Sequence, residues 1–255
     1  MSSIKSITHV PRFKPLLDLP GRSMPFPLGI ALAIFLLLAT VSSPSQGAID
    51  NDPLQPLNRA THQFNRTLDR FVVKPLATSY KKLTPAIVRT GVRNFFSNLD
   101  DVRVTVNDLL QFKFDQAAAD FSRFAVNSTF GLGGLVDVAG PVLSLDKNRQ
   151  DFGKTLAHWG VGAGPYVVLP LLGPSTVRDA FGLGFDSLVD PIQSLDNVES
   201  RNSLLAAKMV NFRAGILNFD DWMIGDEYLF IRGIYLQHRE YSINGGYMTV
   251  AFEEF

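Results

Sequence analysis

The chain has 255 residues, of which 46% are hydrophobic, and its 24 Lys and Arg residues balance its 24 Asp and Glu residues. Residues 1–48 contain four cations and one carboxylate, which leaves 20 basic and 23 acidic residues in 49–255. This segment lacks the clustered positive charge that neutralises nucleic-acid phosphates, so a nucleic-acid partner is excluded. The chain has no Cys, which excludes disulfides, thiolate metal sites and a Cys nucleophile.

The first 48 residues are typical of a secretory signal. The cationic region ends at Arg22, an apolar run of 14 residues occupies 28–41, and small polar residues follow up to Ala48. A hydrocarbon core of about 30 Å needs about 20 residues, so the run is short for a membrane span. We expect cleavage near Gly47 or Ala48, the alternative being an uncleaved anchor. Either way, residues 49–255 lie outside the cytoplasm.

Three helices are predicted before the middle of the chain. An amphipathic helix is expected to end before Pro75, because apolar residues recur at steps of three and four. That spacing is carried by Leu57, Ala60, Phe64, Leu68 and Phe71. Thr84 and Pro85 are expected to be the N-cap and first residue of a second helix, interrupted near residues 99–101. Asp115 is expected to cap a third helix, which runs into a glycine-rich segment.

The second half of the chain also favours helices. Pro170 and Pro174, in and after an apolar run, argue against a central strand and against a helix interior. Ser175 or Thr176 is expected to cap a helix that follows. Further helical patterns cover about 198–223 and 226–243 and stop at Gly245–Gly246. Since few runs alternate with period two, the predicted class is all-α, with one domain over residues 49–255.

The glycine-rich segment STFGLGGLVDVAGP, residues 128–141, could be a phosphate loop, a core turn or a surface for an apolar partner. A dinucleotide fingerprint needs glycine at its first, third and sixth places, but Val136 occupies the sixth. No G-x-S-x-G elbow or HExxH motif occurs elsewhere. We therefore expect no catalytic residue, metal or cofactor. Composition alone leaves the core turn and the apolar contact surface open.

Five sequence blocks, taken in their order along the chain, resemble a known protein family. These blocks are DPLQPLNRATHQFN, KPLATSYKKLTPAIVRTGVRNFFSNLDDVR, DFSRFAVNSTFGLGGLVDVA, DFGKTLAHWGVGAGPYVVLPLLGPSTVRDAFG and DPI. From about residue 52 to 239 the chain closely resembles the MlaA family, also called VacJ. The resemblance implies a ring-shaped bundle of amphipathic helices with a Gly-rich hairpin turn, embedded in the periplasmic leaflet of the outer membrane.

The function that the resemblance implies is intermembrane phospholipid transport. Family members associate with a trimeric outer-membrane porin and remove phospholipid mislocalised to the outer leaflet through an amphipathic channel. They pass it to a soluble periplasmic carrier (MlaC-like), which maintains outer-membrane lipid asymmetry without an enzymatic step. The alternatives are an envelope scaffold that binds porins without moving lipid, and a periplasmic hydrolase.

The resemblance also assigns site residues. The channel hairpin would be Gly131, Leu132, Gly133, Gly134 and Leu135, and the first helix would bring Phe64 and Asn65 near the channel. One departure is the missing Cys, which in family members commonly receives acyl chains. Without it, retention is expected to depend on apolar helices, on the porin or on an uncleaved segment 28–41.

Overall fold

A computed structural model describes residues 52–223 and 225–245, so the expected signal or anchor at 1–48 and Gly246 lie outside the described residues. The helices and strands, in chain order, are α2 (Gln55–Leu68), the π-helical turn η2 (Asp69–Val73), α3 (Lys74–Leu83), α4 (Ala86–Leu110), α5 (Phe114–Thr129), α6 (Ala139–Leu143), α7 (Phe152–His158), β1 (Tyr166–Leu169), β2 (Gly173–Thr176), α8 (Val177–Val189), α9 (Val198–Gly215), the 3₁₀ helix η3 (Leu217–Trp222) and α10 (Glu227–Ile243).

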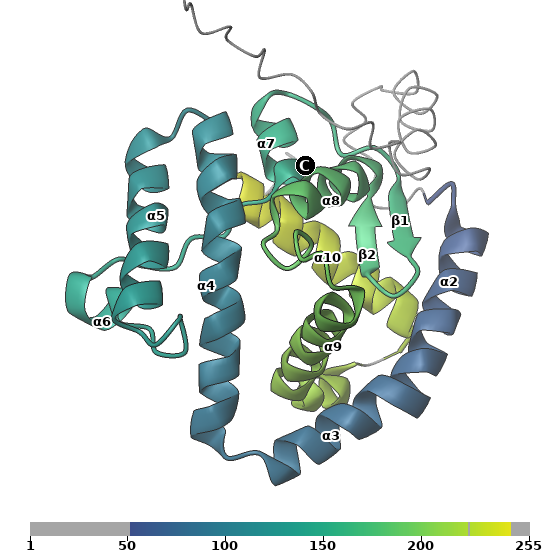
Figure 1. Cartoon of the computed structure of the whole chain (residues 1–255). Helices are drawn as coiled ribbons and strands as arrows, with labels where there is room; N and C mark the ends of the chain where they lie inside the picture. The colour runs from purple at the N-terminus through teal and green to yellow at the C-terminus, as the bar shows by residue number, and fades with distance from the viewer. Residues whose placement is uncertain (1–51, 224, 246–255) are drawn as a thin grey trace, which may run out of the picture.

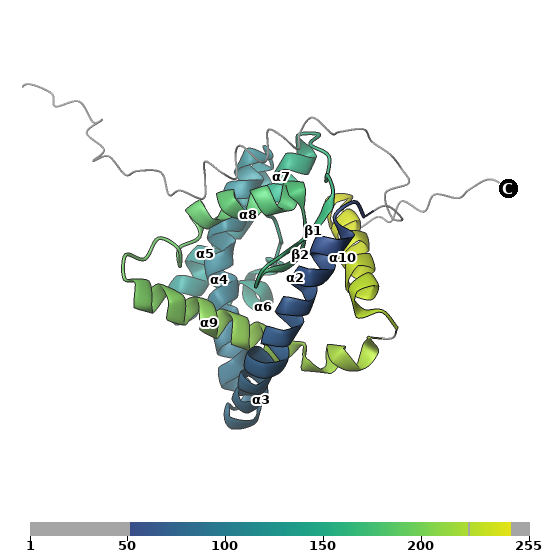
Figure 2. The same cartoon turned by 90° about the vertical axis from the view of Figure 1, so that its right-hand side faces the viewer.

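The helices form an open frame. In Figure 1, α2, α3 and α4 make its right, lower and left sides, while α7, α8 and the β1–β2 hairpin close its upper end. Helix α9 lies on the front face of the frame and α10 on the back, as the turned view in Figure 2 confirms. Helix α5 packs along the outer side of α4, and α6 follows it. None of the helices in the described part of the chain is long and apolar enough to cross a membrane.

The predicted all-α class is confirmed, and one small sheet accompanies the helices. Strands β1 and β2 pair antiparallel, with Tyr166 opposite Thr176 and Leu169 opposite Gly173. Both strands are edges of this two-stranded sheet, which is where Pro174 is tolerated. The expected cap at Thr176 is confirmed, because its side chain accepts a hydrogen bond from the Asp179 N–H at 3.2 Å.

Helix α2 ends at Leu68, before Pro75 as expected, but the helical path of the chain does not break there. The chain passes from α2 to α3 through η2, where the Lys74 N–H donates to the Asp69 carbonyl five residues back. Pro75 therefore falls in the first turn of α3, where its missing N–H costs little. A π turn contains one more residue than a regular turn, and sequence periodicity gives no sign of it.

Three further expectations are also corrected. Helix α4 is continuous through residues 99–101, where the buried Asp101 is paired with Lys147. Pro85 is the N-cap of α4 and Thr84 the C-cap of α3, one residue from the expected positions. Asp115 lies in the first turn of α5 and makes no cap, because the helix already begins at Phe114. Each difference depends on contacts distant in sequence or on one-residue boundaries.

The distribution of polarity is unusual. Large hydrophobic side chains are exposed on several elements, with Leu83 at 84%, Ile87 at 82% and Phe130 at 77%. The largest side chains with less than 2% exposure are Ile192, Val104, Asn58, Asn107, Thr155, Thr176, Asp101, Asp108, Asp120 and Ser175. Only the first two of these are apolar. A domain surrounded by water normally shows the opposite arrangement.

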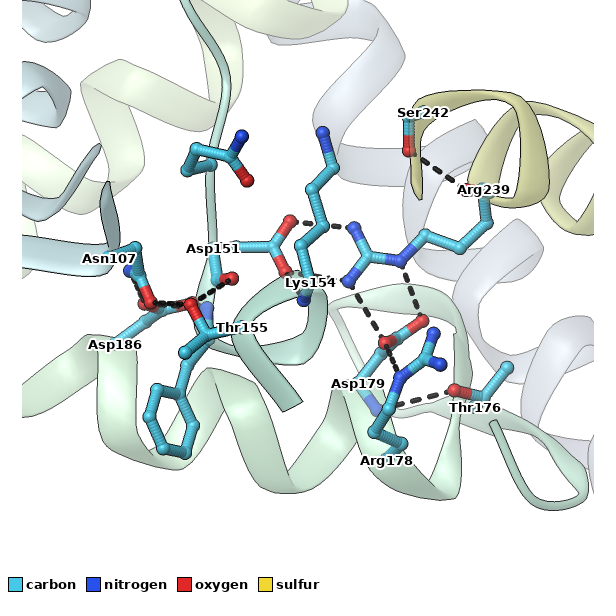
Figure 3. Close-up of polar contacts among 12 residues, drawn as sticks. Asn107, Asp151, Lys154, Thr155, Thr176, Arg178, Asp179, Asp186, Arg239 and Ser242 are labelled. Carbon is cyan, nitrogen blue, oxygen red and sulfur yellow. Dashed lines mark hydrogen bonds and ion pairs between the residues drawn. The ribbon is translucent and has the colours of Figure 1, made fainter. Parts of the chain in front are cut away.

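Arg239 of α10 joins three helices (Figure 3). Its guanidinium donates to both carboxylate oxygens of Asp151 at 2.6 Å and to both oxygens of Asp179 at 2.8 and 2.9 Å. Burial opposes ionisation of the two carboxyl groups, but hydrogen bonds from Arg239 hold the pKa of each below its ordinary value. Asp151 also caps α7 by accepting from the Lys154 N–H. This network fastens α10 to α7 and α8.

A second buried cluster joins α4, α5 and the loop before α7. Asn148 donates to Asp108 at 3.0 Å and to Asp120 at 3.1 Å, and both carboxyl groups are fully buried. Burial, together with the hydrogen bond and charge of Asp120, raises the pKa of Asp108 to about 7. Within the described residues, the Oδ1 atom of each carboxyl group has no hydrogen-bond partner, and a proton shared between the two groups would satisfy both.

We predict that Arg239→Lys lowers stability by about 2 kcal/mol or more, because an ammonium cannot reproduce the forked contacts to two buried carboxylates. Thermal unfolding of the detergent-extracted protein measures this. Arg93→Lys is the matched control, since Arg93 is exposed. Equal midpoints for the two variants would contradict the role of Arg239.

We predict that Asp108→Asn removes part of the pH dependence of stability. The folded state holds a proton up to about pH 7, whereas an unfolded Asp releases it near its ordinary pKa, so stability falls as pH rises through 7. Asparagine can donate to Asp120 at every pH. The variant should therefore be more stable than wild type at pH 8 by on the order of 1–3 kcal/mol, and the difference should shrink at pH 4. Unfolding midpoints at both pH values test this, and an unchanged pH profile would contradict it.

Candidate functional site

The glycine-rich segment forms a tight turn between α5 and α6. Leu132, Gly133 and Gly134 have positive φ angles of 54°, 70° and 92°. The Gly133 N–H donates to the Ser128 carbonyl at 3.1 Å, and the Gly134 N–H donates to the Asn127 carbonyl at 2.8 Å. These bonds satisfy carbonyls at the end of α5 that have no partner within the helix.

Two of the glycines are required by packing. A Cβ at Gly131 would lie 2.2 Å from the Val136 carbonyl oxygen and 2.4 Å from that of Asn127. A Cβ at Gly134 would lie 2.7 Å from the Asn98 side chain on α4. At Gly133, by contrast, an added Cβ meets nothing within 4 Å, and only its φ favours glycine. Gly133 therefore lies at the open side of the turn.

The turn is polar underneath and apolar outside. Asn127 accepts hydrogen bonds from the N–H groups of Val138 and Ala139 at 2.7 and 2.9 Å, and it donates to Asp137. Asp137 also accepts from Arg123 of α5. On the outside, Leu132 is 74% exposed and Leu135 45%. A rigid polar base thus presents apolar side chains outward.

Phe64 and Asn65 lie elsewhere in the frame. The Asn65 side chain donates to the Leu169 carbonyl at 2.9 Å and accepts from the Leu171 N–H at 2.8 Å, so it ties α2 to the β1–β2 hairpin. The neighbouring Phe64 is 54% exposed. Helix α2 and the glycine turn occupy opposite sides of the frame in Figure 1, so the structure does not bring the two predicted groups together.

Sequence reasoning named Asn65 but missed Asn58, the second asparagine that holds the β1–β2 hairpin. Asn58 donates to the Tyr166 carbonyl and accepts from the Val168 N–H, both at 2.9 Å. Asn58 and Asn65 are seven residues apart, which places them on the same face of α2. Two asparagines at that spacing were the available signal. Among the residues that the structure describes, no group of three or more His, Asp or Glu is arranged to hold a metal ion.

We predict different costs for alanine at two neighbouring glycines. Gly131→Ala should prevent stable folding or lower stability by several kcal/mol, since the Cβ would overlap two backbone oxygens. Gly133→Ala should cost only about 1 kcal/mol, the penalty of a left-handed backbone. Unfolding midpoints of the two purified variants distinguish them, and equal losses would contradict this account of the turn.

Comparison with known proteins identifies the family. A family model described as MlaA lipoprotein matches residues 50–242. A relative named intermembrane phospholipid transport system lipoprotein MlaA, from Escherichia coli K12, is 35% identical over 223 residues, which are 85% of this chain and 88% of that protein. An uncharacterized protein of Rickettsia bellii is 39% identical over 196 residues, covering 75% of this chain and 76% of that protein.

A solved structure supports the same assignment. It was described under "Structural basis for maintenance of bacterial outer membrane lipid asymmetry", and the two chains share 33% identity with a TM-score of 0.68. The match covers 76% of this chain and 100% of the other. With a matching family model over most of the chain, full-length relatives and a shared fold, the chain belongs to the MlaA family.

Proposed function

We propose that the protein is a phospholipid transporter of the outer membrane. It removes phospholipid mislocalised to the outer leaflet through an amphipathic channel and passes it to a soluble periplasmic carrier, which maintains lipid asymmetry. The names of its relatives and the subject of the matching structure support this proposal. The proposed transport has no covalent step and no cofactor.

The inverted polarity of the frame is the observation that carries the proposal. Exposed Leu, Ile and Phe side chains suit contact with acyl chains, whereas the buried carboxylates and amides are paired inside. In hydrocarbon, backbone polar groups must be bonded within the protein, which the helices achieve. We place the frame in the periplasmic leaflet, after export by the N-terminal signal and next to a trimeric porin.

The glycine turn is proposed as part of the lipid path. Its apolar outer side chains can contact acyl chains, and Gly133 leaves space where any other residue would add a side chain. Gly131 and Gly134 keep the turn packed against α4 and α5, so the turn remains in place while lipid passes. In this proposal, Phe64 supplies a further apolar contact from α2.

We predict that Gly133→Asp raises the amount of phospholipid at the cell surface several-fold, because a charge would be placed in an apolar path. Asp tolerates a left-handed backbone better than most residues, so the variant should fold. The experiment expresses wild type, Gly133→Asp and the control Gly133→Ala in cells lacking their own copy. Surface phospholipid is then measured by its accessibility to added phospholipase.

Two outcomes would contradict the proposal. The first is that cells expressing Gly133→Asp, at the same protein level as wild type, show the same amount of surface phospholipid as wild-type cells. The turn would then not be part of the lipid path. Purified protein that carries no co-extracted phospholipid, and that restores no asymmetry in the deficient cells, would instead favour a scaffold that only binds porins. Release of fatty acid or lyso-lipid from vesicles by the pure protein would favour a hydrolase.

A further inference from the structure

A charged cavity of about 670 Å³ lies between α2 and the segment that leads into α10. Figure 2 shows these elements side by side, with α3 below them. The cavity walls include Arg59, His62, Arg66, Arg70, Arg213 and Glu227. Its volume is that of a site for a small organic ligand. The glycine turn contributes no residue to it.

Most of the charges around the cavity pair with one another. Arg213 donates to Asp69 at 2.8 and 2.9 Å and to Asp220 at 2.8 and 2.9 Å. These hydrogen bonds raise the pKa of Arg213 above its ordinary value and, with Lys74, hold the pKa of Asp220 below its own against the effect of burial. Arg66 pairs with Glu227 at 3.0 Å. The ion pairs fix the walls in place.

Arg70 is the cation at the cavity that remains available to a ligand. Arg70 makes no ion pair or hydrogen bond with a carboxylate within residues 52–223 and 225–245, and its guanidinium lies 5.6 Å from the centre of the Phe71 ring. His62 lies beneath the cavity wall, with its Nε2 atom covered by protein and 3.7 Å from Glu227 Oε1. Burial lowers the pKa of His62, so the positive charge at this wall comes from the arginines.

The surroundings of Arg70 are amphipathic. The π turn η2 directs Asp69 and Arg70 to the cavity. Phe71, the next residue, is apolar and 70% exposed, whereas the exposed Val72 and Leu76 belong to the opposite side of the helix. A ligand with one charged end and one apolar end would therefore satisfy the cavity and the adjoining surface together. π-helical turns are frequent at functional sites, which agrees with this arrangement.

We propose that this cavity binds the headgroup of a phospholipid, with Arg70 as the residue that binds the phosphate. Guanidinium matches a phosphodiester in charge and in hydrogen-bond geometry. The acyl chains extend from the cavity over the exposed Phe71 ring. The inference rests on the proposed lipid transport and adds a headgroup site that is separate from the glycine turn.

The test measures binding of dioctanoyl phosphatidylethanolamine to the full chain in a phosphate-free detergent. Arg70→Gln should weaken binding about tenfold or more, as expected for loss of a charge-assisted hydrogen bond to phosphate. Arg149→Gln is the matched control, because Arg149 is also exposed and lies outside the cavity. It should bind like wild type. Arg70→Lys keeps the charge and should recover part of the affinity, while unfolding midpoints establish that all variants are folded.

Two further probes separate the lipid from its parts. Dioctanoylglycerol lacks phosphate and glycerophosphoethanolamine lacks acyl chains, so wild type should bind each at least tenfold more weakly than the lipid. Binding of glycerophosphoethanolamine equal to that of the lipid would overturn the amphipathic site. If wild type and folded Arg70→Gln bind the lipid equally, the role of Arg70 is wrong, while the proposed lipid transport is unaffected. Wild type that binds no phospholipid would overturn the proposed function as well.

Discussion

The fold depends on the pairing of buried charges. Arg239 holds α10 against α7 and α8, and Arg123 reaches Asp137 beneath the glycine turn. Among the described residues, Tyr166, Val168 and Tyr228 form a small apolar cluster between the β1–β2 hairpin and α10, while the other buried hydrophobic residues are distributed over several helices. In the proposed lipid surroundings, burying apolar surface contributes little free energy to helix association. Polar contacts in the interior must therefore contribute more of that free energy. The exposed side chains and the paired interior are thus two results of one constraint.

Local patterns in the sequence were enough for the helical class and for several element ends. The spacing of Leu57, Phe64 and Phe71 predicted α2, and Thr176 was an identifiable cap. The failures came where distant contacts decide the structure. Asp101 stays in a continuous helix because Lys147 pairs with it from 46 residues away, which no local window can reveal. The unbroken passage from α2 through η2 into α3 was not expected, because the additional residue of η2 has no signature in apolar spacing.

The candidate site was predictable in part. The sequence located the glycine turn, and family resemblance supplied its expected channel role along with Phe64 and Asn65. Sequence gave no means of separating Gly131 and Gly134, which are needed for packing, from Gly133, which faces open space. The charged cavity was hidden for a similar reason. Its walls come from α2, η2, the start of α3, the end of α9, η3 and the start of α10. Arg70 can be singled out only when its neighbours are known to pair with each other.

The π turn has a consequence for the evolution and engineering of the chain. The turn accommodates one residue more than a regular helical turn, so deleting one residue from 69–73 would restore a regular helix with little rotation of α3 relative to α2. Asn58 and Asn65 would still face the β1–β2 hairpin, and the buried Ala77 of α3 would keep its packing. A deletion would instead displace the side chains of the turn itself, where Asp69 pairs with Arg213 and Arg70 lies at the charged cavity. The π turn thus lets the chain add side chains at the cavity without disturbing the two helices that flank it.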